Sequence, residues 1–236
     1  QIFRLRMTED DAADALEHLG SVSAELDRAC AGFSAAAGAI QADETLLSRA
    51  FGGGTEDTRV YALLFEHTGG ARDYARFDLY DAQGQRRYST RSGHAPDTLP
   101  TDWGVLGRAS RQDAPVFAAC EGSDASSPLF QCASALSSPE GGTAGYLVIS
   151  LYQSDFYTLL EGKYGAGETL LLLDPYWRSV YCAQPSLGET LVPELGLTAR
   201  AHMAQVLEYC QYYAAHFSPE SSPSLYLFGG AGLGKT

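Results

Sequence analysis

Residues 74–90 have the sequence YARFDLYDAQGQRRYST. Apolar and polar side chains alternate as far as Tyr80, which is the period of a strand with one buried face. Residues 81–84, DAQG, have the composition of a turn, and residues 85–90 return as the partner strand. The stretch therefore predicts an antiparallel hairpin.

Further strand-like runs follow this hairpin and precede it. We predict strands at residues 59–66, 115–120, 128–136 and 143–152, a second hairpin from 168–174 and 178–182, and short helices at 97–110 and 154–164. Strands joined by turns in sequence order indicate an antiparallel meander. The predicted fold class is α+β, with one antiparallel sheet over residues 59–183.

Residues 8–50 are predicted to form one long helix that ends at the glycines 52–54. Every seventh residue is apolar, and this stripe contains Leu19, Leu26, Phe33, Ile40 and Leu47. Such a stripe is typical of a buried core face or of a seam in a homodimer. We expect the helix to pack along the sheet, and a homodimer through it remains open.

The charge and the apolar content limit the classes of partner. The net charge of −13 and the pI of about 4.7 disfavour nucleic acid, which requires a basic surface. Hydrophobic residues make up 45%, enough for a packed core, yet no apolar run approaches the roughly 20 residues of a membrane span. We therefore predict small-molecule binding, with any membrane attachment supplied by segments outside this chain.

None of the five cysteines has the C-x-x-C spacing of a zinc or redox motif. Cys120 and Cys132 flank a polar loop between two predicted strands, so a disulfide across that hairpin is one interpretation. Two buried thiols are the other, and we favour it slightly. The other three are Cys30, Cys182 and Cys210.

A pocket for a small polar ligand combines apolar walls with a few convergent polar groups. The candidate ligand-binding residues are Tyr74, Arg76, Asp78, Trp103 and Phe117. The alternative is that Phe117 and Trp103 belong to the core and that Arg76 and Asp78 form a surface pair.

The sequence shows no arrangement of catalytic or metal-binding residues. No Ser/His/Asp constellation is evident, so we do not expect an enzyme. His67 and His94 lie near Asp73 and Asp97, but their spacing matches no standard metal motif. We predict neither a metal nor a cofactor for residues 1–195.

The C-terminal residues 229–236, GGAGLGKT, fit the phosphate-loop pattern, with Gly229, Gly234, Lys235 and Thr236 as nucleotide-binding candidates. Residues 224–228 would be the preceding strand and residues 198–217 a helix. The helix that should follow the loop and hold the phosphates is not part of the sequence, so we expect no ATP hydrolysis and at best weak binding of ATP and Mg²⁺. With no initiator Met at Gln1, we expect an excerpt of a longer protein.

Residues 8–195 resemble the Cache family of extracytoplasmic sensor domains. The features that carry the resemblance are the long N-terminal helix, the hairpin at 77–90, the strand at 145–151 that leads into a helix, and the later strand with its hairpin partner. The resemblance implies a PAS-like fold that binds a small molecule on one face of its sheet. It also implies the ectodomain of a bacterial histidine kinase, chemoreceptor or cyclic-dinucleotide enzyme, outside the cytoplasmic membrane.

Residues 198–236 resemble a different family, the cytoplasmic AAA+ loaders of the replicative helicase, through AHMAQVLEYC at 201–210 and the phosphate loop. That resemblance implies a truncated ATPase fragment at residues 196–236. The alternative function that it implies is a fragment of a cytoplasmic, ATP-binding helicase loader of DNA replication. Since the two families work on opposite sides of a membrane, a join near residue 195 is the interpretation that we favour.

Overall fold

The computed structural model describes residues 9–52, 57–93, 95–120, 127–138, 141–165, 168–174 and 179–186. The predicted helix 198–217, the strand 224–228 and the phosphate loop lie outside these residues. The domain division at residue 195 and the nucleotide-binding role of the loop stay predictions.

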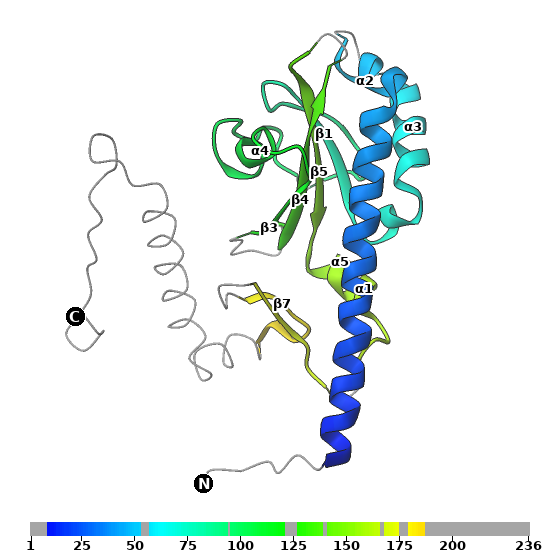
Figure 1. Ribbon diagram of the computed structural model, residues 1–236, viewed down its shortest axis with the longest axis vertical. Helices are drawn as coiled ribbons and strands as arrows, with labels where there is room; N and C mark the ends of the chain where they lie inside the picture. Colours follow the sequence, from blue (N-terminus) through cyan, green and yellow to red (C-terminus); the bar gives the residue numbers. More distant parts are fainter. Residues whose placement is uncertain are drawn as a thin grey trace, which may run out of the picture.

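A five-stranded antiparallel sheet forms the centre of the domain, in the order β2-β1-β5-β4-β3 (Figure 1). The predicted hairpin at 74–90 is confirmed: Asp78 pairs with Ser89 and Leu79 with Tyr88. Gly84 in its turn has a φ of +75°, and a Cβ there would lie 2.0 Å from the Leu99 carbonyl oxygen. The strands are β1 (Arg76–Asp81), β2 (Arg86–Ser89), β3 (Val116–Ala119), β4 (Phe130–Ser137) and β5 (Thr143–Leu151).

Helices cover both faces of this sheet (Figure 1). Phe33 and Ile40 of the first helix are buried against Phe77, Leu147 and other sheet residues. The fold is therefore α+β with a long N-terminal helix on an antiparallel sheet, as the sequence predicts. The helices are α1 (Glu9–Ala42), α2 (Glu44–Phe51) and α3 (Thr58–Thr68) on one face and α4 (Gly104–Ala109) on the other. Among the described helices, none is both long and apolar enough to cross a bilayer.

The predicted strand at 59–66 is wrong, because these residues belong to α3. Its buried side chains are Val60, Leu64 and Thr68, which recur at the helical spacing of four. Asp57 caps the helix by accepting a hydrogen bond from the Arg59 N–H at 2.9 Å. The helix cap and the burial of one helical face therefore outweigh the β-prone composition of these residues.

The predicted single helix over 8–50 is interrupted at Asp43. Its side chain accepts a hydrogen bond from the Leu46 N–H at 2.9 Å, which begins α2 as a new helix. Its other carboxylate oxygen lies 2.8 Å from Nε2 of His67 in α3. One carboxylate thus joins the end of α1, the start of α2 and the end of α3.

Replacing Asp43 by alanine should lower the free energy of unfolding by about 1–2 kcal/mol, the usual cost of removing a helix N-cap. Asn caps as well as Asp, so Asp43→Asn should lose less. The two hydrogen bonds to Asp43, from His67 first and from Leu46 second, lower its pKa. The ionised carboxylate therefore stabilises the fold above about pH 4, and this part is lost as the pH falls further. Urea unfolding at pH 7 and near pH 3 tests both statements. If Asp43→Ala lowered the free energy of unfolding by the same amount at both pH values, the statement about the ionised carboxylate would be contradicted.

The predicted second hairpin is confirmed, but it lies outside the main sheet. β6 (Leu171–Leu173) and β7 (Ser179–Cys182) pair only with each other, so residues 59–183 do not form one sheet. The hairpin follows α5 (Gln153–Leu160) and lies beside the N-terminal part of α1 (Figure 1). Ion pairs from Lys163 to Glu25 and from His18 to Glu168 join this region to α1.

The described cysteines are free thiols. Cys132 pairs in register with Phe117, and Cys120 follows the end of β3, so the two do not face each other. Burial raises the pKa of the Cys132 thiol to about 12. The disulfide interpretation is therefore wrong for this pair, and Cys210 lies outside the described residues.

Candidate functional site

The alternation of β1 places two charged side chains on the sheet face opposite α1. Phe77 and Leu79 belong to the core beneath α1, and Tyr80 belongs to the separate core beneath α4. Arg76 and Asp78 share the parity of Tyr80, so they lie on the α4 face.

Arg76 and Asp78 form a buried ion pair. Their side chains are only 3% and 1% exposed, and Nε of Arg76 donates to both carboxylate oxygens at 3.0 and 2.9 Å. The interpretation as a surface pair is therefore wrong. Burial is the largest influence on Asp78 and raises its pKa, against the Ser89 hydroxyl and the Arg76 guanidinium, which lower it. A buried, perturbed ion pair of this kind is common at functional sites.

One end of the Arg76 guanidinium has no partner in the described part of the chain. Its Nη1 donates to the Gly93 carbonyl, whereas its Nη2 is buried without an acceptor. A buried donor left unsatisfied costs about 1–3 kcal/mol, and more when it is charged. Native proteins seldom leave such a group without a partner, so Nη2 marks a place for an acceptor that the described residues do not supply.

Arg76 lines a groove of about 580 Å³ along the outer edge of the sheet. This volume falls in the usual range of small-molecule sites. We call it the arginine groove, after the four arginines that line it. Its walls are Tyr61, Phe65, Arg76, Gln85, Arg86, Arg87, Tyr88, Ser89, Thr90, Arg91, Ser92, Gly93 and Asp97.

Two ion pairs fix the loop beside this groove. Arg86 pairs with Asp97 and donates to the Ala95 carbonyl, which holds the loop against β2. Arg91 pairs with Asp155, a buried residue that also accepts a hydrogen bond from the Tyr152 N–H at the start of α5. The groove is thereby connected to the start of α5.

A smaller polar cluster continues the α4 face beyond Arg76. Ser150 of β5 pairs in register with Arg76 and is 2% exposed. Its hydroxyl accepts a hydrogen bond from the Gln131 side chain at 3.2 Å. The polar end of the sheet therefore offers a hydroxyl and an amide near the ion pair, with apolar residues beneath α4 on the other side.

The structure does not bring the five predicted ligand-binding residues to one pocket. Tyr74 packs against the Phe33 ring at 6.1 Å, within the core beneath α1. Phe117 has the parity of Cys132, which also faces α1, and is 40% exposed. Trp103 precedes α4 and is 68% exposed, so the prediction that it belongs to the core is wrong as well. Only Arg76 and Asp78 lie together.

Sequence reasoning missed the other arginines of the groove. Arg86 and Arg87 are adjacent in the predicted hairpin strand, and Arg91 directly follows it. Three arginines within six residues of an acidic chain form a signal that was open to sequence analysis. Their convergence on Arg76 depends on the pairing of β1 with β2.

The expected lack of a metal motif receives no test from this structure. His67 is bound to Asp43, and His94 lies outside the described residues. In the described part of the chain, no three His, Cys, Asp or Glu side chains gather in a way that would hold a metal ion.

No protein-family model matches the sequence, and no curated protein matches it. Solved structures do match. The sensor domain of the V. cholerae histidine kinase DctB has 14% identity and a TM-score of 0.50, over 74% of this chain and 67% of that one. The ligand-binding domain of the Campylobacter jejuni chemoreceptor Tlp3, solved with L-valine, has 12% identity and a TM-score of 0.52, over 75% and 72%. At this identity the likeness shows the fold, and the fold is that of sensor and ligand-binding domains.

Proposed function

We propose that the chain is a small-molecule sensing module of a bacterial membrane receptor, exposed outside the cytoplasmic membrane. The fold supports this proposal, because the structures that it resembles are described as a histidine kinase sensor domain and a chemoreceptor ligand-binding domain. The output is a histidine kinase, a chemoreceptor or a cyclic-dinucleotide enzyme. The module itself binds and does not catalyse, and it takes no nucleic acid.

One observation carries the proposal. Nη2 of Arg76 is buried and has no acceptor in the described part of the chain, although the same side chain lines a groove that could hold a small molecule. A buried guanidinium nitrogen without an acceptor does not stabilise the fold. A bound molecule with an acceptor atom satisfies it.

The proposed homodimer uses the N-terminal part of α1. Leu19 of the apolar stripe is 54% exposed, in contrast to Phe33 and Ile40, and Leu16, three residues before it, is 70% exposed. These side chains are where a second copy would bind.

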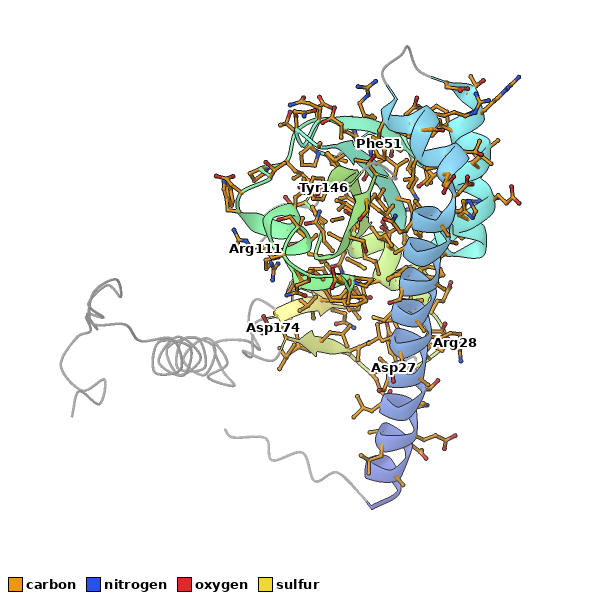
Figure 2. All side chains as sticks on the ribbon, turned by 45° about the horizontal axis from the view of Figure 1, so that its top comes forward. Asp27, Arg28, Phe51, Arg111, Tyr146 and Asp174 are labelled. Atoms are coloured by element: carbon orange, nitrogen blue, oxygen red, sulfur yellow. The ribbon has the colours of Figure 1, made fainter. Side chains whose placement is uncertain are left out.

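Screening of small polar metabolites should reveal a stabilising ligand. We expect amino acids, carboxylates or purines to include one that raises the melting temperature, since binding to the folded state stabilises it by mass action. The shift should vanish in the double variant Arg76→Met/Asp78→Asn and persist in Arg111→Gln, which removes an exposed arginine on the α4 side (Figure 2). Duplex DNA should give no shift. A ligand whose effect survives the double variant would place the site elsewhere.

A further inference from the structure

We infer that the arginine groove takes an organic anion that has an apolar or aromatic body and no ammonium group. The inference rests on the proposed function and specifies the ligand class for that site. It is carried by the charges around the groove, by the state of each nearby carboxylate and by the composition of the opposite wall.

The groove is basic in a protein of net charge −13. Four arginines line it, at positions 76, 86, 87 and 91, and among the described lining residues Asp97 is the one acidic side chain. Like charges are strongly disfavoured in a confined site, so this lining attracts an anion and repels a cation.

The carboxylates of this region are already engaged. Asp97 pairs with Arg86, and Asp155 pairs with Arg91 and with the Tyr152 N–H. Asp81 accepts hydrogen bonds from two backbone N–H groups of its own turn, at 3.0 and 2.9 Å.

Asp78 lies deepest, and both of its oxygens accept from Arg76. An ammonium group entering the groove would compete with Arg86 for Asp97 and with Arg76 for Asp78. An anion finds Nη2 of Arg76 unpartnered among the described residues and buried. Arg76 therefore offers a donor for the carboxylate of a ligand, whereas the nearby carboxylates that could accept from an ammonium group already have partners. This difference disfavours a zwitterion.

The wall formed by α3 is apolar. Tyr61 lies edge-on to Tyr88 with ring centroids 5.3 Å apart, and Phe65 is 38% exposed. The guanidinium of Arg72 lies over the Phe65 ring at 5.1 Å. Rings on one side and guanidinium groups on the other suit a ligand with an apolar body and an anionic end.

Three probes that differ only in charged groups test the inference. They are 3-phenylpropionate, L-phenylalanine, which adds an ammonium group, and 2-phenylethylamine, which has no carboxylate. Titration calorimetry on the full chain should give at least about tenfold tighter binding of 3-phenylpropionate than of L-phenylalanine, because like charge in the site is costly. The amine should not bind.

Variants connect the binding to Arg76. Arg76→Met/Asp78→Asn removes both charges together, so no buried charge remains alone, and it should abolish binding of 3-phenylpropionate. Arg76→Lys keeps the positive charge but removes the planar guanidinium group, and it should weaken the binding of 3-phenylpropionate. Arg111→Gln should bind as the wild type does, and circular dichroism checks that each variant is folded.

The outcomes separate the two proposals. L-phenylalanine that binds as tightly as 3-phenylpropionate, with the same dependence on Arg76, would overturn the ligand class and leave the sensing function in place. Failure of 3-phenylpropionate to bind would also overturn the class, whatever else binds. If no molecule in the wider metabolite screen binds in an Arg76-dependent way, the proposed function fails too.

Discussion

Arg76→Met should lower the free energy of unfolding by about 3–5 kcal/mol, because it leaves the Asp78 carboxylate buried without its partner. Asp78 is 1% exposed, and the nearby Ser89 hydroxyl, which donates to the Arg91 carbonyl, does not replace the two hydrogen bonds from Arg76. Burial already raises the pKa of Asp78, so loss of the guanidinium favours the neutral carboxyl further. Urea unfolding at pH 7 measures the loss.

The matched control is the double variant Arg76→Met/Asp78→Asn. Replacement of both members of a buried pair is often close to neutral, whereas removal of one is strongly destabilising. We therefore expect the double variant to recover most of the stability. A single variant as stable as the double one would show that Asp78 is not held in its charged form by Arg76, and the electrostatic account of the site would be wrong.

Local sequence patterns predicted the central strands, although β1 and β5 are buried on both faces. The hairpin at 74–90 was predicted from the alternation of apolar and polar residues, and the strand at 143–152 from a continuous apolar run. Residues 59–66 misled the prediction, since an apolar run of that length fits a strand and a buried helix equally well. The deciding feature was the cap at Asp57, whose effect depends on one side-chain oxygen reaching the Arg59 N–H.

The site was predicted only where it lies within one strand. Arg76 and Asp78 are two residues apart, so a strand assignment already places them side by side. Arg91 approaches its partner Asp155 across 64 positions of sequence. Such a contact follows from the packing of α5 on the sheet, which no local pattern specifies.

Phe33→Ala should be the most destabilising change within the apolar stripe of α1, at about 3–5 kcal/mol. The ring is 1% exposed and lies 6.2 Å from the Phe77 ring and 6.1 Å from the Tyr74 ring, between α1 and the sheet. Its removal takes away the buried surface and leaves a cavity that rigid neighbours on both sides cannot fill. The free energy of unfolding in urea, with an unchanged m-value, measures the effect.

Leu19→Ala is the matched control, because Leu19 occupies the same heptad stripe two repeats earlier but is 54% exposed. At protein concentrations too low for the proposed homodimer, truncation of a side chain with that exposure should cost no more than about 0.5 kcal/mol. The difference between the two variants therefore separates the buried part of the stripe from its exposed part. If Leu19→Ala costs as much as Phe33→Ala, and its cost grows with protein concentration, then the exposed end of α1 is itself covered in solution, and the covering surface is a second copy of the chain.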